Sequence, residues 1–474
     1  MPRSEFKSAY VSEGEGIDQY EQLSNVADRL SAGEITSVEL VEQTLARIER
    51  LDGTLGSYSF VDAEGALSTA AELDARRGEE NGPLYGVPIA VKDIYEVKGW
   101  PAAHGMPSRV GQVSVHTATV VKRLQAAGAI ILGKVHTTEG VYAEHTDPFR
   151  APLNPWDGSR WSGVSSSGSG VSTAAGLCYG ALASDTGGSI RMPASANGLT
   201  GIKPTWGRVS RANVFELAAT LDHVGTLTRS VMDGALMLAA IAGRDEADPT
   251  SSLFPVDDYI RAVTAGVDGL RVGIDRSWAY TDISEDVRVA LDRALAILES
   301  LGATIVDIAF PDSEAIVEDW FDVCGVQTAR AHGTWYDEHK SDYGAALREI
   351  IERGRALDST SYDELLQRRA RFMGEAEGVL AAVDTMLVPG LPFEAPPAAD
   401  MERMDEETVA QVHRYTVPFT MSQLPTVTVP GGFSDHGLPV SVQFVGSKFD
   451  EATVLRVAGS FQSVTDWHKR HPAL

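Results

Sequence analysis

Two glycines directly before a serine form the most reactive-looking segment of this chain, DTGGSIR at residues 185–191. Adjacent glycines let the backbone turn tightly, so that successive N–H groups converge on one point and form an oxyanion hole. On its own, such a segment is more typical of a glycine-rich turn closed by a serine. If it is catalytic, Ser189 is the nucleophile, and the backbone N–H groups of Thr186, Gly187, Gly188 and Ser189 are the oxyanion donors.

A serine nucleophile needs a base, and the chain shows no Ser-His-Asp arrangement. Lys92 ends the apolar run GVPIAVKD, residues 86–93. A lysine in this position usually extends into solvent. If it is instead desolvated, its pKa falls and the free amine can accept a proton from a serine. The hydroxyl-rich loop of residues 165–168 (SSSG) offers further partners.

The segments around these residues predict an α/β fold. Thr36 and Glu39 form a capping box that begins a helix, and residues 63–77 predict a second one. Apolar runs at 86–93 and 129–132 predict buried strands on either side of a helix at 117–127. This strand–helix–strand order favours a mixed, mainly parallel sheet covered by helices on both faces.

The same order returns later in the chain. Strands are expected at 270–274 and 303–308 around a helix at 284–301, and PTVTVP and LPVSVQFVG predict two further strands joined by GGFSDHG. A last helix is expected to begin at Asp450. Because strands are predicted along the whole sequence, we expect one large α/β domain over residues 1–474 rather than three separate ones.

Composition excludes several kinds of partner. Lys and Arg number 40 against 66 Asp and Glu, and 40 − 66 = −26. Such a charge repels phosphate backbones and anionic lipid, so we expect neither nucleic acid nor a membrane as partner. Residues 161–184 carry no charge but are rich in Ser and Gly, which favours a buried or site-lining segment over a membrane span.

The remaining motifs argue against other chemistry. Gly128–Lys134 begins like a phosphate-binding loop but continues with Val135 instead of Ser or Thr, so nothing is placed to ligand magnesium. The 11 histidines show no metal-binding spacing. Two cysteines and a start without an apolar signal region favour a reducing, cytoplasmic location. No metal or cofactor is therefore expected.

Taken together, GVPIAVKD, the Gly/Ser run of residues 163–169 and DTGGSIR resemble the amidase signature family. The resemblance extends from about residue 23 to residue 468 and leaves residues 1–20 as an N-terminal extension. It implies the amidase signature fold and a Ser–cis-Ser–Lys triad. Matched residue by residue, Ser189 is the nucleophile, Ser165 the bridging cis-serine and Lys92 the base. The family separates the two serines by 24 residues, and 189 − 165 = 24.

Two positions depart from the family pattern. Val164 stands where relatives often have glycine, although the serine that follows is kept. His413 stands where the glutamine-using amidotransferases carry an aspartate that holds the ammonium group of glutamine. This difference and the acidic surface lower the weight of a tRNA-dependent transamidation role.

The resemblance therefore implies an amidohydrolase that cleaves an amide, anilide or acyl hydrazide through an acyl-serine. The alternatives are the A subunit of a glutamine amidotransferase in a tRNA-dependent transamidation complex and a catalytically inactive scaffold. Asp185 and Arg191 are expected to brace the loop, and a homodimer is left open. Substrate-pocket candidates are Gly140, where the small residue suggests extra room, Val141, Tyr142 and the aromatic region of Phe321–Tyr336 with Trp320 and Trp335.

Overall fold

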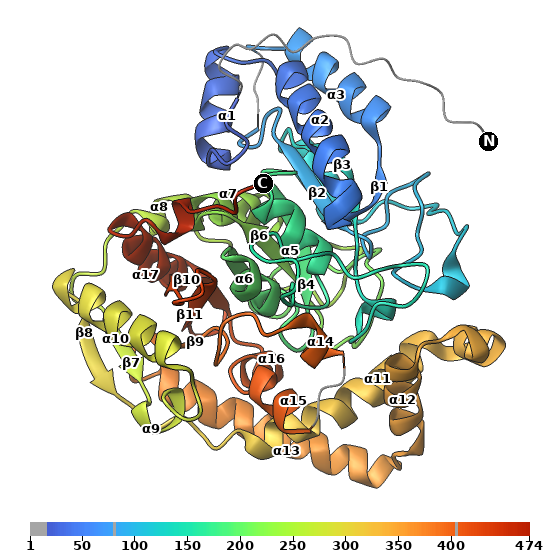
Figure 1. Cartoon of the computed structure of the whole chain (residues 1–474). Helices are drawn as coiled ribbons and strands as arrows, with labels where there is room; N and C mark the ends of the chain where they lie inside the picture. Colours follow the sequence, from blue (N-terminus) through green and yellow to red (C-terminus); the bar gives the residue numbers. More distant parts are fainter. Residues whose placement is uncertain (1–16, 79–81, 403–405) are drawn as a thin grey trace.

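The computed structural model describes residues 17–78, 82–402 and 406–474, so most of the expected N-terminal extension lies outside the described residues. Its strands form one sheet of eleven described strands (Figure 1). In sheet order they are β1 (Tyr58–Val61), β3 (Ile130–Val135), β2 (Pro88–Lys92), β4 (Gly180–Asp185), β6 (His223–Thr228), β5 (Thr200–Lys203), β10 (Thr426–Phe433), β11 (Pro439–Val445), β9 (Thr385–Pro389), β7 (Arg271–Ile274) and β8 (Thr304–Asp307).

The α/β class and the mixed sheet are confirmed, but the expected predominance of parallel pairing is wrong. The parallel pairs are β2 with β3 and β4, and β7 with β8 and β9. The other six pairings between described strands are antiparallel. Strand–helix–strand units build only the two flanks of the sheet, whereas its middle contains the β10–β11 hairpin and strands that reverse direction.

Seventeen α-helices accompany the sheet in the described part of the chain. They are α1 (Leu23–Ala32), α2 (Ser37–Leu55), α3 (Ala63–Ala75), α4 (Thr119–Ala126), α5 (Ser167–Ala174), α6 (Arg191–Asn197), α7 (Val231–Ile241), α8 (Tyr259–Val263), α9 (Arg276–Ala279), α10 (Glu285–Ser300), α11 (Glu314–His339), α12 (Ala345–Ala356), α13 (Ser359–Leu380), α14 (Ala398–Met401), α15 (Glu406–His413), α16 (Val417–Met421) and α17 (Glu451–Ser463).

Side chains on β2 alternate between two cores, as expected for a strand buried on both faces. Ile89 and Val91 belong to the large core that also contains apolar residues of α4 and α7. Ala90 belongs to a second core with residues of α2, α3 and α5. The prediction that helices cover both faces of the sheet is therefore confirmed here, and Lys92, at the end of β2, lies inside the protein.

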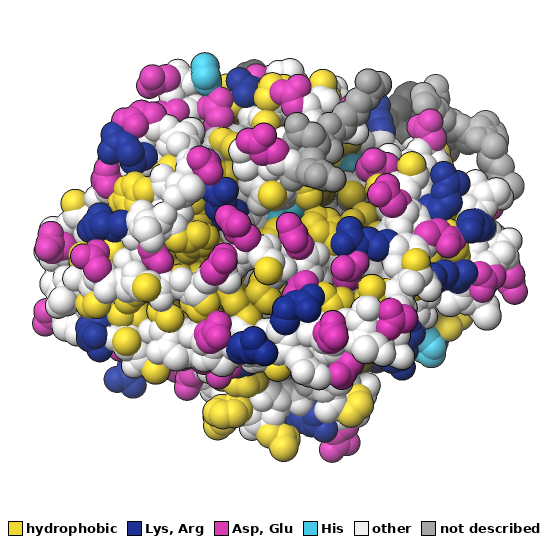
Figure 2. Space-filling model, turned by 90° about the horizontal axis from the view of Figure 1, so that it is seen from below, with side chains coloured by type: hydrophobic (Ala, Val, Ile, Leu, Met, Phe, Trp, Pro, Cys, Tyr) yellow, Lys and Arg dark blue, Asp and Glu magenta, His cyan; other side chains and the backbone are white. Residues whose placement is uncertain are grey.

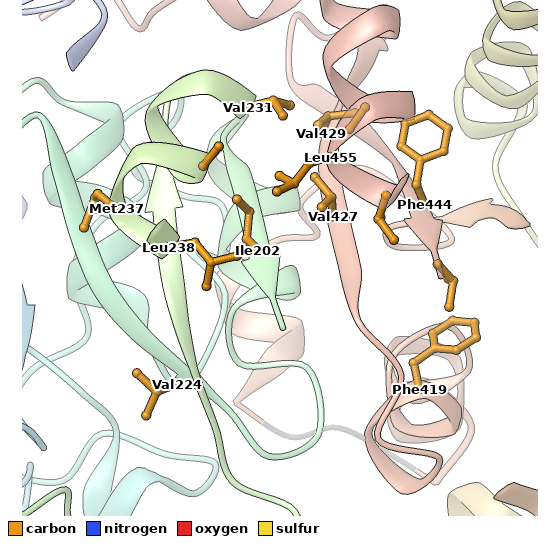
Figure 3. Close-up of a cluster of buried hydrophobic side chains, with 14 of the residues drawn as sticks. Ile202, Val224, Val231, Met237, Leu238, Phe419, Val427, Val429, Phe444 and Leu455 are labelled. Atoms are coloured by element: carbon orange, nitrogen blue, oxygen red, sulfur yellow. The ribbon is translucent and has the colours of Figure 1, made fainter. Parts of the chain in front are cut away.

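The large core continues into the other half of the sheet (Figure 3). Ile202 of β5, Val427 of β10 and Phe444 of β11 lie in it together with Leu238 of α7 and Leu455 of α17. This packing joins strands from the middle and the end of the chain. The expectation of a single domain over residues 1–474 stays a prediction.

Several local predictions are confirmed. Thr36 and Glu39 form the capping box of α2, and Asp450 caps α17 by accepting a hydrogen bond from the Thr453 N–H. The uncharged segment 161–184 is buried almost throughout. Among the described residues, no helix combines the length and the apolar character that a membrane crossing requires.

Gly133, within the phosphate-loop-like sequence, is required by packing. It pairs with Val61 of β1, and a Cβ atom there would lie 2.1 Å from the Phe60 carbonyl oxygen. We expect Gly133→Ala to lower the free energy of unfolding by about 1–3 kcal/mol, because a backbone atom must move. Urea unfolding measures this, with Gly374→Ala as control: that exposed helical position has open space and should gain stability by up to about 1 kcal/mol. Equal effects of the two substitutions would contradict the packing argument.

Candidate active site

The Lys92 side chain is fully buried at the end of β2 and contacts two serines. Its Nζ atom lies 2.8 Å from the Ser165 Oγ and 2.9 Å from the Ser184 Oγ. Ser184 is the penultimate residue of β4, which pairs with β2 in parallel. The two neighbouring strands therefore bring the amine and a hydroxyl together, and the loop before α5 supplies the second hydroxyl.

This environment changes the acidity of Lys92. Burial lowers the pKa of its amine from the usual value to about 7, although the carboxylates of Asp185 and Asp222 act in the opposite direction. Neither direct partner carries a charge, so the ammonium form gains no ion-pair contact. A large fraction of Lys92 is consequently a free amine at neutral pH, as the sequence hypothesis requires of a base.

Further hydrogen bonds hold the serine loop in place. The Val164–Ser165 peptide bond is cis, in agreement with the bridging cis-serine that the resemblance implies. Ser166 donates its hydroxyl to the Ser184 carbonyl at 3.2 Å. Ser167 Oγ lies 2.9 Å from His145 Nε2. Every hydroxyl of this loop thus has a partner, and that of Ser165 faces Lys92.

A buried ion pair organises the segment of residues 185–191. Asp185 and Arg191 have no exposed surface, and Arg191 donates to the carboxylate through Nε at 2.9 Å and Nη2 at 2.7 Å. The same carboxylate accepts the N–H groups of Gly188 and Ile190. Burial alone would raise the pKa of Asp185, but the guanidinium holds it well below its usual range. The pairing of Asp185 with Arg191 is as predicted.

These contacts correct the list of oxyanion donors. The Gly188 N–H lies 2.8 Å from an Asp185 oxygen, so it is already used and does not serve as a free donor. Among the described residues, the N–H groups of Thr186, Gly187 and Ser189 have no acceptor. Gly187 is also enforced by packing, because a Cβ atom there would lie 2.5 Å from the Trp320 ring. Three N–H groups remain available.

Ser189 lies on the wall of a cavity of about 730 Å³, within the size range of small-molecule sites. Val164, which precedes Ser165, lines the same cavity, as do Thr186 and Gly187. The apolar part of the wall consists mainly of Val141, Tyr142, Trp161, Met192, Leu217, Val317, Trp320, Phe321, Ile350, Met401, Val409 and Val412. The predicted nucleophile, the remaining oxyanion donors and the cis-serine loop therefore border one space.

Two of the pocket expectations are wrong. Gly140 does not provide extra room, because Leu347 and His332 already fill the space beside it and a Cβ atom would lie 2.6 Å from Leu347. Its neighbours Val141 and Tyr142 do line the cavity. In the aromatic region, Trp320 and Phe321 line the cavity, whereas Trp335 and Tyr336 do not. These two lie farther along α11 and pack in an apolar cluster with Met106 and Tyr343.

Sequence reasoning missed Ser184 and Asp222, and it named Trp320 as a pocket candidate without its supporting hydrogen bond. Ser184 holds Lys92, Asp222 accepts the Thr186 hydroxyl at 2.7 Å, and Trp320 donates its indole N–H to the Thr186 carbonyl at 2.7 Å. Ser184 could have been found from the sequence, because it directly precedes the segment DTGGSIR of residues 185–191. The hydrogen bonds of Asp222 and Trp320 to Thr186 join distant segments, and no local pattern predicts them.

Within the described residues, no group of three or more His, Cys, Asp or Glu side chains is placed to share a metal ion. The expectation of a metal-free site stays a prediction.

The cavity wall includes charged residues, namely Glu144, Glu318, Glu349, Arg353 and Glu402. Acidic side chains are spread over the face of the molecule that Figure 2 shows, on the side of α11, α12 and α13.

Comparison with known proteins gives consistent results. A family profile described as Amidase matches residues 39–455. The chain is 43% identical to a Mycobacterium tuberculosis protein named "Putative amidase AmiD", over 95% of both chains. It is 34% identical to the A subunit of glutamyl-tRNA(Gln) amidotransferase from Chloroflexus aggregans, over 96% of this chain and 98% of that one. The structure of 6-aminohexanoate cyclic dimer hydrolase complexed with substrate matches with a TM-score of 0.88 and 26% identity, over 96% and 99% of the two chains.

The contribution of the buried Asp185–Arg191 pair to stability can be measured by substitution. We expect Asp185→Asn to lower the free energy of unfolding by about 3–5 kcal/mol, because Arg191 would keep a buried and uncompensated charge. The matched control is Asp307→Asn at the exposed pair with Arg276, which should cost less than about 1 kcal/mol. Denaturant unfolding of both variants gives the comparison, and similar small losses would show that the buried pair is dispensable.

Proposed function

The chain belongs to the amidase signature family, and from this membership and the geometry of its site we propose that it is an amidohydrolase acting through an acyl-serine on Ser189. Its substrates are small molecules with a carboxamide-type C–N bond, as in an amide, an anilide or an acyl hydrazide. The observation that carries the proposal is the buried Lys92 amine, whose pKa is lowered to about 7 and which contacts Ser165 behind the cavity that Ser189 lines.

In the proposed first half-reaction, Ser189 Oγ attacks the carbonyl carbon of the bound amide. Its proton passes to Ser165 Oγ, and the proton of Ser165 passes to the neutral Lys92 Nζ. The carbonyl oxygen becomes an oxyanion, and the unpaired N–H groups of Thr186, Gly187 and Ser189 stabilise it. Ser184 keeps Lys92 in position through its 2.9 Å contact.

The tetrahedral intermediate then breaks its C–N bond. The proton returns from Lys92 through Ser165 to the leaving nitrogen, which departs as a neutral amine, ammonia or hydrazine. Water attacks the acyl-Ser189 ester in the second half-reaction, and its proton follows the same relay. Breakage of the ester C–O bond gives the carboxylic acid and restores the Ser189 hydroxyl, so atoms and protons balance over the cycle.

The cavity wall supports an aromatic or bulky apolar acyl group. Trp161, Trp320 and Phe321 present ring surface to the space beside Ser189, and Met192 adds a flexible apolar side chain. Beside Ser189, the unpaired backbone N–H groups of Thr186, Gly187 and Ser189 offer hydrogen-bond donors. An amide that places its carbonyl at this backbone and its acyl group against the rings would satisfy both parts of the wall.

The similarity to an amidotransferase favours a second candidate, in which the chain acts on glutamine within a complex. The neutral His413 in the cavity wall and the net charge of −26 speak against it. A panel of amides, anilides, hydrazides and glutamine given to the isolated chain distinguishes the candidates. Hydrolysis of other amides would favour the amidohydrolase, and hydrolysis of glutamine alone would favour the amidotransferase. No hydrolysis at all would fit the inactive scaffold and also an amidotransferase subunit without its partner chains. A cytoplasmic location and a homodimer stay predictions.

We expect kcat/KM to rise with pH through about 7 and then to level off. Lys92 acts as a base only when unprotonated, so its active fraction grows as the pH passes its pKa of about 7. Lys92→Arg should be nearly inactive from pH 6 to 10, because arginine keeps its proton over this range. Lys122→Arg, at an exposed position, is the matched control and should leave the profile unchanged. Substantial activity of Lys92→Arg would mean that position 92 supplies charge rather than proton transfer.

Ser189→Ala should reduce kcat by at least about 10³-fold while substrate still binds, because the cavity and the other groups remain. A serine-directed fluorophosphonate should add its mass to the peptide that contains Ser189. Intact-protein and peptide mass spectrometry follow the label, with Ser159→Ala, an exposed serine, as the control. Labelling that persists in Ser189→Ala would remove Ser189 from the nucleophile role.

A further inference from the structure

His413, the last residue of α15, lines the cavity with its imidazole in a fixed protonation state. Its Nδ1 atom lies 2.8 Å from the Val409 carbonyl oxygen. A carbonyl oxygen can only accept, so Nδ1 carries the hydrogen of this bond. Burial lowers the pKa of His413 to about 4, so the ring is neutral at pH 7 and holds no second proton. Its Nε2 atom is therefore a hydrogen-bond acceptor.

No group of the described residues uses this acceptor, since the contact with Val409 is the single hydrogen bond of the His413 ring among them. Aromatic neighbours hold the ring from two sides. The Trp320 and Phe321 ring centroids lie 5.3 Å and 5.6 Å from that of the imidazole. Both of these residues also line the cavity. A neutral acceptor thus stands in an otherwise aromatic part of the wall.

The position of this acceptor is tied to the segment that carries Ser189. The Thr416 N–H donates to the His413 carbonyl at 3.1 Å, and the Thr416 hydroxyl donates to the Gly187 carbonyl at 2.6 Å. Trp320, which contacts the imidazole, donates to the Thr186 carbonyl. Two independent contacts therefore hold His413 in place relative to residues 186–189, the oxyanion segment. A group that selects a substrate by hydrogen bonding needs such a fixed position.

From these observations we propose that His413 determines specificity, accepting through Nε2 a hydrogen bond from a neutral N–H or O–H group on the acyl part of the substrate. The inference rests on the proposed amidohydrolase function and names its substrate class: amides whose bulky or aromatic acyl group carries a hydrogen-bond donor. An analogue without the donor leaves the imidazole nitrogen unpaired after water has been displaced, and it is rejected for that reason.

The charged part of the wall narrows this class further. Glu144, Glu318, Glu349 and Glu402 line the cavity, and none of them forms an ion pair with another described residue. Arg353, the one lysine or arginine among the lining residues that the structure describes, is paired with Asp322 at 2.5 Å. A substrate carboxylate would meet these four carboxylates and one arginine that is already paired, and it has no hydrogen to give to Nε2. Acyl groups that carry a carboxylate are therefore excluded from the class.

The test uses matched benzamides that carry a hydroxyl, a methoxy or a carboxylate group at position 3 or 4 of the ring. For the wild type we expect kcat/KM of one hydroxybenzamide to exceed that of its methoxy counterpart by about tenfold or more, the effect of one buried hydrogen bond. In His413→Phe this ratio should fall to about one, because only the hydroxyl substrate slows. His413→Gln, which retains an acceptor oxygen, should restore part of it, and His116→Phe, an exposed histidine, should leave it unchanged.

Binding of the same benzamides to Ser189→Ala, measured by calorimetry, gives the ratio without turnover. Long-range ¹H–¹⁵N spectra of the histidines, assigned with His413→Gln, report the tautomer directly, and the Nδ1–H form is expected at pH 7. The proposal would be overturned if the hydroxy and methoxy compounds had equal kcat/KM values and equal affinities. An Nε2–H tautomer of His413 would also overturn it. The amidohydrolase function fails separately, if no amide is hydrolysed and no fluorophosphonate adds to Ser189.

Discussion

The buried ion pair between Asp185 and Arg191 is the interaction on which the rest of the site depends. One carboxylate receives the guanidinium and the N–H groups of Gly188 and Ile190, so the chain must turn tightly between the end of β4 and the start of α6. Arg191 also donates to the Thr416 carbonyl at 2.6 Å, which fastens the segment before α16 to the same point. The turn leaves the N–H groups of Thr186, Gly187 and Ser189 without an acceptor among the described residues, and Ser189 itself on the cavity wall.

Two lysines on neighbouring strands are buried but have different partners. Lys134 on β3 keeps a carboxylate partner, with its Nζ atom 2.9 Å from Asp93, and it has a structural role. Lys92 on β2 contacts only hydroxyls, so nothing in direct contact compensates its charge and burial lowers the pKa of its amine to about 7. The choice of partner, hydroxyl or carboxylate, thus separates a candidate base from a packed ion pair.

What could be predicted from the sequence is what neighbouring residues determine together. Capping at Thr36, the strand that ends at Lys92 and the pairing of Asp185 with Arg191 are all short-range features, and each is present. The errors concern long-range packing. The space beside Gly140 is filled by Leu347, about two hundred residues later in the chain, and the balance of parallel and antiparallel pairs depends on which distant strands meet. Gly188 is a short-range error. Its N–H was expected to be an oxyanion donor, but it donates to the side chain of Asp185, three residues earlier.

Chemistry and recognition come from different parts of this chain. The proposed catalytic groups lie between β2 and α6, whereas much of the cavity wall that a substrate's acyl group would meet belongs to α11, α12 and α15. The two parts are not independent, because Trp320 and Thr416 are hydrogen-bonded to the carbonyls of Thr186 and Gly187. Substitutions at Glu318 or Glu349, which lack such bonds, can alter substrate preference without moving the oxyanion segment. Substitutions at Trp320 or Thr416 must disturb binding and catalysis together, since each of these residues holds a peptide group of that segment.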